Sequence, residues 1–255
     1  MTAPVVAASG LVFEVDGARL VDDVSIEAAR GELLGVVGPN GAGKTTLLSL
    51  LAGELAPTSG RVLLDGRDVA GMSALELAQT RAVLPQASLL RFAFQALDVV
   101  LMGRYPHPTG DEQDRVVAAA SMESTDTSQL AQRIYPTLSG GEQTRVSLAR
   151  VLAQETPVLF LDEPTGSLDL RHQETVMAIN TALAAAGGTV VAVLHDLNVA
   201  ARHADRIAVM SRGEIVEVGP ARQILRRELV EDVYGLSVEV IDRPGSDRPL
   251  IVPGA

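Results

Sequence analysis

A glycine-rich loop near residue 40 carries the residues best suited to hold phosphate. Residues 38–45 read Gly-Pro-Asn-Gly-Ala-Gly-Lys-Thr, which fits the pattern GxxxxGK(S/T) between an apolar run and a helical pattern. Glycines let the backbone wrap so that N–H groups point at phosphate oxygens, and the helix N-terminus adds partial positive charge. The predicted phosphate-binding residues are Gly38, Pro39, Asn40, Gly41, Ala42, Gly43, Lys44, Thr45 and Thr46.

Lys44 is the single lysine of the chain, which contains 20 arginines. Compositional bias explains the arginines, but it does not explain why the one lysine lies in this loop. A slim point charge on a flexible stem suits a phosphate site. We expect Lys44 to reach the β- and γ-phosphates of a nucleotide and the Thr45 hydroxyl to bind Mg²⁺. The alternative is an ordinary glycine turn that opens a helix.

Two adjacent acids follow a second apolar run. Residues 158–161 read Val-Leu-Phe-Leu and lead directly into Asp162 and Glu163. A buried strand that ends in this way places both carboxylates at the rim of a sheet. We expect Asp162 to hold Mg²⁺ through its waters and Glu163 to polarise an attacking water. A solvated strand end is the alternative, and the nearby phosphate motif makes it the weaker one.

Two further polar residues are candidates for the site, and one of them follows a predicted strand. His195 comes after the apolar run 189–194, where it can contact a γ-phosphate and orient the water held by Glu163. The alternative for His195 is a purely structural role in the turn before Asp196, which is a candidate helix N-cap. Gln86 occupies a place where a Mg²⁺-sensing glutamine could link the core to the next segment, although it could equally be a turn residue.

A second glycine motif precedes a helical pattern. Residues 138–143 read Leu-Ser-Gly-Gly-Glu-Gln, and Ser139 with Glu142 predicts a capping box. Gly140 and Gly141 leave that helix N-terminus open to another anion. A second phosphate site in a chain that already has one indicates that two chains share each nucleotide.

The apolar runs predict the fold that must position these residues. Runs at residues 32–37, 158–161, 189–194 and 206–210 suit strands buried on both faces, as in a parallel sheet. Helical patterns alternate with them, so we predict an α/β fold, a mostly parallel sheet with helices on both faces. Ligands of such sheets bind at the carboxyl ends of the strands.

Other stretches break this alternation. Short antiparallel strands are predicted at 11–15 and 24–28 and near 61–69, whereas 88–138 has no convincing strand and carries helical pieces near 97–104 and 111–122. We predict a P-loop core with an antiparallel β subdomain (1–87 and 142–255) and a helical subdomain (88–141). The tail after Tyr234 reads as short and turn-rich.

Composition excludes several classes of protein. The chain has 255 residues, with 32 acidic and 21 basic ones and a net charge of −11, which argues against nucleic acid as the main partner. It has no cysteine, so disulfides and zinc–thiolate sites are excluded. No apolar run approaches the roughly 20 residues that span a bilayer. Without a recognisable secretory signal, a soluble cytoplasmic protein is expected.

Taken together, the motifs resemble those of the ATP-binding subunits of ABC transporters. GPNGAGKT, Gln86, LSGGEQ, VLFLDEP, the turn Ser167-Leu168-Asp169 and His195 occur in the family's order over nearly the whole chain. The resemblance implies an ABC-type P-loop NTPase that forms a head-to-tail homodimer around two ATP molecules. Each ATP would lie between the phosphate loop of one chain and Ser139–Gly141 of the other, and Asp169 would couple the two sites.

The same resemblance implies the partners of the chain. Two copies of a transmembrane permease would hold the dimer at the cytoplasmic face of the membrane, and the segment after Gln86 would receive a coupling helix from the permease. An extracellular or periplasmic substrate-binding protein would take part indirectly. Residues 83–86, 100–104, 168–173 and 194–206 look like those of haem importer ATPases. Importers of ferric siderophores or cobalamin are the alternative, and a soluble non-transport ABC ATPase is the distant one.

The family often places an aromatic residue before the phosphate loop to stack on adenine. Val15 takes that position here, and Phe13 precedes it by two residues. We therefore expect the base to contribute little to binding.

Overall fold

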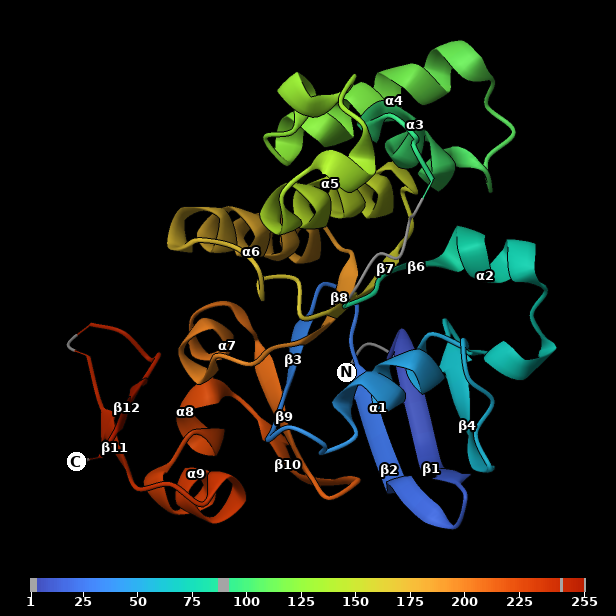
Figure 1. The fold of residues 1–255 in the computed structure, drawn as a ribbon. Helices are drawn as coiled ribbons and strands as arrows, with labels where there is room; N and C mark the ends of the chain where they lie inside the picture. The colour runs from blue at the N-terminus through green and yellow to red at the C-terminus, as the bar shows by residue number, and fades with distance from the viewer. Residues whose placement is uncertain (1–3, 87–91, 244, 255) are drawn as a thin grey trace.

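A mixed six-stranded sheet forms the centre of the computed structural model (Figure 1), which describes residues 4–86, 92–243 and 245–254. The strand order is β10-β9-β3-β8-β7-β6. The strands are β3 (Leu33–Val37), β6 (Arg81–Leu84), β7 (Val158–Asp162), β8 (Thr189–Val193), β9 (Arg206–Ser211) and β10 (Glu214–Gly219). All neighbours pair in parallel except β9 and β10, which form an antiparallel pair. The predicted α/β class is confirmed.

The central strands are buried on both faces because both are covered. Along β3, Leu33 and Val37 pack into one apolar cluster, while Leu34 and Val36 pack into another. The first cluster lies against the helices α5 (Gly140–Ala153), α6 (Leu170–Ala185), α7 (Leu197–His203), α8 (Ala221–Ile224) and α9 (Arg227–Tyr234). The second lies against α1 (Lys44–Leu51) and a separate antiparallel sheet.

That second sheet has four strands in the order β2-β1-β4-β5. Its strands are β1 (Val6–Val15), β2 (Ala18–Ala28), β4 (Ser59–Leu64) and β5 (Arg67–Asp68). The turn η1 (Val69–Gly71) and helix α2 (Ala74–Thr80) lead from it to β6. In Figure 1 this sheet lies beside α1, on the opposite side of the molecule from the C-terminal elements.

A helical part lies above the sheet in the view of Figure 1. It contains α3 (Ala96–Leu101), η2 (Met102–Arg104), α4 (Asp111–Ser124), η3 (Ser128–Leu130) and η4 (Tyr135–Thr137). These elements share an apolar cluster with Val146, Ala149 and Ala153 of α5, whereas Leu148 and Val151 of the same helix pack into the core of the large sheet. Helix α5 therefore belongs to both parts, and the domain boundary near residue 141 stays a prediction.

The chain after Tyr234 differs from the predicted turn-rich tail. It forms an antiparallel pair, β11 (Val238–Ile241) with β12 (Leu250–Pro253). Val238 and Ile251 are buried in the core cluster that also contains the helices. This packing holds the two strands in place, and their short sequences of mixed apolar and polar residues do not predict it. No helix in the described part of the chain has the length and apolar content needed to cross a membrane.

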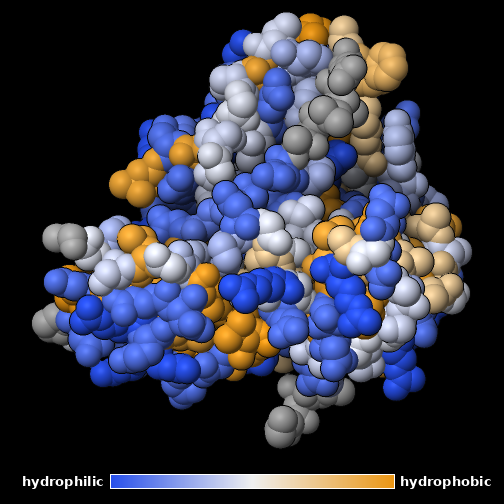
Figure 2. Space-filling view, turned by 60° about the horizontal axis from the view of Figure 1, so that its bottom comes forward, coloured by the Kyte–Doolittle hydropathy of each residue, from blue (hydrophilic) through white to orange (hydrophobic). Residues whose placement is uncertain are grey.

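Hydrophilic side chains predominate on the face shown in Figure 2, which views the molecule from the end drawn at the bottom of Figure 1. Apolar residues form small separate groups there. Such scattered groups are ordinary for a protein surface and mark no extended apolar interface on this face.

Candidate active site

Three neighbouring parallel strands bring the predicted chemical groups to one edge of the sheet. The phosphate loop follows β3, His195 follows β8, and Asp162 with Glu163 ends β7. Because parallel strands end on the same edge, these groups converge although up to 157 positions separate them in sequence (38 to 195). One cavity is lined by Leu20, Glu163, His195 and seven consecutive residues of the phosphate loop and α1, numbers 40–46.

The phosphate loop is shaped by glycines that no other residue could replace without displacing the backbone. Gly43 has φ 97°, and a Cβ there would lie 2.2 Å from the carbonyl oxygen of Leu20. At Gly38 a Cβ would lie 2.0 Å from the carbonyl oxygen of Met210. The loop thus fits closely between β2 and β9, and its backbone is held before any ligand arrives.

Lys44 is folded back onto the loop. Its side chain is only 6% exposed, and its Nζ donates to the carbonyl oxygens of Gly38 at 2.8 Å and Pro39 at 2.9 Å. Burial lowers the pKa of Lys44, while the negative charges of Glu163 and Asp162 oppose that shift. An anion in the cavity would favour the charged ammonium and compete with the two carbonyls for it.

Asp162 is a buried carboxylate with an unused acceptor. The residue is 4% exposed, and its Oδ1 has no hydrogen-bond partner among the described residues. Burial raises the pKa of Asp162, and a hydrogen bond with the Thr45 side chain is the largest opposing influence. An orphaned buried carboxylate oxygen beside a hydroxyl fits a hard divalent cation.

The donor set fits Mg²⁺ in particular. Within the described ranges, no group of three or more His, Cys, Asp or Glu side chains could hold a metal ion. Magnesium is commonly bound by one or two carboxylates together with substrate phosphates and water rather than by a full protein cage. Asp162 and Thr45, next to the phosphate loop, are a donor pair of the kind that suits such an ion.

Glu163 and His195 contact each other directly. The backbone of Glu163 is left-handed, with φ 51°, and its N–H donates to the carbonyl oxygen of Val193 at 3.1 Å. Its Oε1 meets Nε2 of His195, and Asp196 caps the helix that follows by accepting from the N–H groups of Asn198 and Val199. This arrangement holds a carboxylate and an imidazole as a pair in the wall of the cavity.

Gln86 lines a second cleft, between the large sheet and the helical part. Its neighbours there include Asp162, Glu163, Gly140 and Ser167. Gln86 is exposed, so it can approach the carboxylates from the side of the helical part. The segment predicted to receive a coupling helix begins with residues 87–91, which lie outside the described residues.

The second glycine motif forms the N-terminus of α5. The predicted capping box is confirmed: Glu142 accepts from the N–H of Ser139 at 2.8 Å, and the Ser139 hydroxyl accepts from the N–H of Glu142 at 3.4 Å. Gly140 lines the cleft of Gln86, and none of Ser139–Gly141 lines the cavity of the phosphate loop. Asp169 is exposed and caps α6 through the N–H of His172.

Leu20 is a lining residue that the sequence reasoning missed. It lies on β2 and is 40% exposed, at the wall of the phosphate-loop cavity. Val15, which takes the place of the stacking aromatic, does not line that cavity, and Phe13 packs against the core. An exposed leucine in an alternating strand carries no sequence signal, so only the packing of β2 on the loop reveals it.

The fold and the arrangement of these groups are those of a P-loop nucleoside triphosphatase. The ABC transporter family matches residues 21–166, more than half of the chain. The protein belongs to that family as an ATP-binding subunit.

Individual relatives and structures cover most of the chain. The hemin import ATP-binding protein HmuV of Nocardia farcinica is 49% identical over 254 residues, covering 96% of this chain and 88% of that protein. HmuV of Myxococcus xanthus is 51% identical over 244 residues, covering 92% and 91%. An inward-facing structure of a transporter described as metal-chelate type has a TM-score of 0.84 at 28% identity, covering 99% and 98%. A dimeric ATP-binding cassette with bound ADP and Pi has a TM-score of 0.78 at 28% identity, covering 85% and 98%.

Proposed function

We propose that this protein binds and hydrolyses ATP to energise haem uptake through a membrane permease. The observation that carries the cargo assignment is the identity of 49–51% to HmuV proteins over more than 90% of the chain. The convergence of Lys44, Asp162, Glu163 and His195 on one edge of the sheet supports an active hydrolase.

Nucleotide binding rests on the phosphate loop. Gly41 and Gly43 line the cavity that the triphosphate would enter, where their backbone N–H groups can donate to it, and Lys44 would leave the carbonyls of Gly38 and Pro39 to contact the β- and γ-phosphates. Thr46, in the first turn of α1, also lines this cavity and adds a further contact for the phosphates. Leu20 adds only an apolar wall to the cavity, so we expect the triphosphate to dominate affinity.

Glu163 and His195 act on the water that attacks the γ-phosphate. Glu163 accepts hydrogen bonding from that water and polarises it, and His195 holds Glu163 and contacts the γ-phosphate. Bound Mg²⁺ supplies neutralisation of phosphate charge. Thr45, Asp162 and Gln86 are the residues that would hold it, Asp162 through its waters, and the unpartnered Oδ1 of Asp162 leaves an acceptor for such a water.

A complete site requires a second copy of the chain. Ser139–Gly141 lie outside the phosphate-loop cavity of their own chain, and their helix N-terminus is open to an anion. In the proposed homodimer, Ser139, Gly140 and Gly141 of the partner subunit contact the γ-phosphate. Asp169, exposed beside Ser167, couples the two sites.

Two permease copies bind the dimer at the cytoplasmic face of the membrane. The exposed position of Gln86, between the catalytic carboxylates and the helical part, lets permease movement reach the active site. A substrate-binding protein on the outer side delivers cargo to the permease. Nucleic acid is not a partner, in keeping with the net charge of −11.

Growth and transport test the cargo. Deletion of the gene should abolish growth on haem as the sole iron source, and growth should return with the wild-type gene but not with a Glu163→Gln gene. ATP-dependent haem uptake into vesicles that contain the subunit and its permease should show the same pattern. Intact haem use after deletion would exclude the assignment.

Import of another metal chelate is the second candidate. The solved metal-chelate type transporter, with a TM-score of 0.84, favours it. The same deletion strain separates the two candidates. If it still uses haem but no longer grows on a ferric siderophore, or no longer uses cobalamin, the cargo assignment changes and the ATPase assignment stands.

A further inference from the structure

A pair of hydroxyl groups joins α5 to the turn that follows the adjacent carboxylates. Thr144 lies in the second turn of α5, and its Oγ1 is 2.9 Å from the Oγ of Ser167. The Thr144 hydroxyl also donates to the carbonyl oxygen of Gly140 at 3.0 Å. Because a hydroxyl has only one proton to donate, Ser167 is the donor to Thr144.

The glycines at the start of α5 let the helix approach this turn closely. A Cβ on Gly141 would lie 3.3 Å from Cδ2 of Leu168 and 3.3 Å from the carbonyl oxygen of Ser167. A Cβ on Gly140 would lie 3.8 Å from the Cβ of Ser167. Even a methyl group at position 141 would therefore press on the turn, and the hydrogen bond lies beside this tight contact.

The turn that carries the serine begins at Glu163 and is held by its own hydrogen bonds. The N–H of Gly166 donates to the carbonyl oxygen of Glu163 at 3.2 Å, and the N–H of Leu168 donates to that of Thr165 at 3.2 Å. From α6, the side chain of Gln173 donates to the carbonyl oxygens of Thr165 at 3.3 Å and Leu168 at 3.0 Å. Five residues after Glu163 are thus fixed as one unit.

The carboxylate of Glu163 lies over the same turn. A Cβ on Gly166 would be 3.6 Å from its Oε2, and its Oε1 meets Nε2 of His195. Glu163, Thr144 and Ser167 all line one cleft between the large sheet and the helical part. A displacement of α5 that pulls on Ser167 is therefore passed through a short, closed turn to the carboxylate.

We propose that the hydrogen bond from Ser167 to Thr144 positions Glu163 relative to Ser139–Gly141. In the proposed dimer, Ser139–Gly141 contact the ATP of the partner subunit, whereas Glu163 acts on the ATP of its own chain. The bond keeps these two contributions of one chain at a fixed spacing. Thr144 and Ser167 are positioning residues, because neither lines the phosphate-loop cavity. The inference rests on the proposed function, since it assumes ATP hydrolysis at a shared site.

Ser167→Ala tests the bond by removing its donor. At saturating Mg-ATP, the kcat of the full-length variant should fall about three-fold. This is toward the lower end of the effect of one net hydrogen bond, because neither Ser167 nor Thr144 is fully buried. The Kd for ATP should stay at the wild-type value, since no contact of the phosphate-loop cavity is lost.

Variants of Thr144 test the acceptor. Thr144→Val keeps the shape of the side chain without the hydroxyl and should also lower kcat about three-fold, whereas Thr144→Ser keeps an acceptor and should retain near wild-type kcat. The double variant Ser167→Ala/Thr144→Val should lose about three-fold as well, because both changes remove the same bond. Independent effects would instead multiply to about nine-fold.

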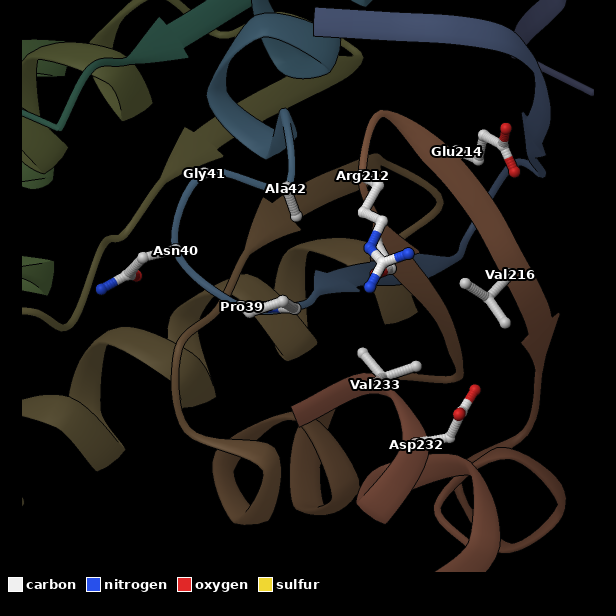
Figure 3. A pocket seen from close by; sticks show the side chains of 10 residues that line it. Pro39, Asn40, Gly41, Ala42, Arg212, Glu214, Val216, Asp232 and Val233 are labelled. Carbon is white, nitrogen blue, oxygen red and sulfur yellow. The ribbon is translucent and has the colours of Figure 1, made fainter. Parts of the chain in front are cut away.

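The cavity drawn in Figure 3 supplies a matched control. Pro39–Ala42 of the phosphate loop line it, around a volume of about 480 Å³, and Figure 3 shows Arg212 projecting into it. Ser211, the residue before this arginine, also lines the cavity, and none of its described lining residues lines the cleft of Thr144 and Ser167. Ser211→Ala removes a serine hydroxyl near the phosphate loop and should leave kcat and Kd at wild-type values.

The outcomes are distinct. Lower kcat with unchanged Kd in both single variants, near wild-type kcat in Thr144→Ser and no further loss in the double variant support the positioning role. Wild-type kcat in either single variant overturns it, even if the melting temperature falls, because the bond then only stabilises the fold. A changed Kd, a low kcat in Thr144→Ser or a nine-fold loss in the double variant also overturns it. Each of these results leaves the proposed function standing, whereas a wild-type protein that neither binds nor hydrolyses ATP overturns both.

Discussion

Replacing Asp162 by asparagine should stabilise the protein without nucleotide while removing its response to Mg²⁺. Asp162 is 4% exposed and its Oδ1 is unpartnered. Burial raises the pKa of this carboxyl above its ordinary value of 3.8. Between those two pKa values the folded state binds more protons than the unfolded state, so stability falls as pH rises and the loss persists at neutral pH. The neutral amide of asparagine removes that loss.

The expected magnitude follows from the unpaired atom. A buried acceptor without a partner costs about 1–3 kcal/mol, and asparagine still buries a polar group, so we expect a gain of about 1 kcal/mol. In a chain of this size that raises the melting temperature by about 2–4 °C. Wild-type protein with Mg-ATP at about 100 times its Kd should gain about 2.7 kcal/mol.

Thermal unfolding of both proteins is measured at neutral pH with no ligand, with ATP and EDTA, and with ATP and Mg²⁺. Wild type should show a larger shift with Mg²⁺ than with EDTA, and Asp162→Asn should show equal shifts. Asp205→Asn is the matched control, because Asp205 accepts from the N–H of Leu33 at 2.8 Å at the other end of β3; it should keep the Mg²⁺ effect and gain no stability. A lower melting temperature for Asp162→Asn without nucleotide, or a preserved Mg²⁺ effect, would refute the reasoning.

Other variants probe separate steps. Lys44→Ala should abolish ATP hydrolysis without unfolding the protein, and near-normal turnover at saturating Mg-ATP would contradict its role. Glu163→Gln should bind ATP, form a dimer on sizing chromatography with Mg-ATP, and leave the ATP uncleaved; a variant that remains monomeric with ATP bound would contradict the shared site. Because neither Val15 nor a phenylalanine, tyrosine or tryptophan side chain lines the phosphate-loop cavity as its lining is described, competition binding should give an ATP preference over GTP below about 100-fold, or about 2.7 kcal/mol. Val15→Tyr should tighten ATP binding, by at most about 1–3 kcal/mol if the new ring stacks on adenine.

Much of the fold follows from the sequence alone. The apolar runs around β3, β7, β8 and β9 predicted strands buried on both faces, and the structure confirms them in one mostly parallel sheet. Local patterns sufficed because each such strand must be covered on both faces, here by helices on one side and by α1 with the antiparallel sheet on the other. The motif order predicted the ABC transporter family, which the family match confirms. The roles of the individual site residues stay predictions.

The tertiary structure alone determined the contacts between segments that lie far apart in the chain. The pairing of Glu163 with His195, the place of Leu20 beside the phosphate loop and the buried Oδ1 of Asp162 depend on side-chain direction and packing. A sequence pattern specifies which face of an element is apolar, but not which atoms of another element meet it. The C-terminal pair β11–β12 shows this most clearly: its strands are four residues each, too short and too mixed to predict, and they are held by Asn198 and by the core beneath them.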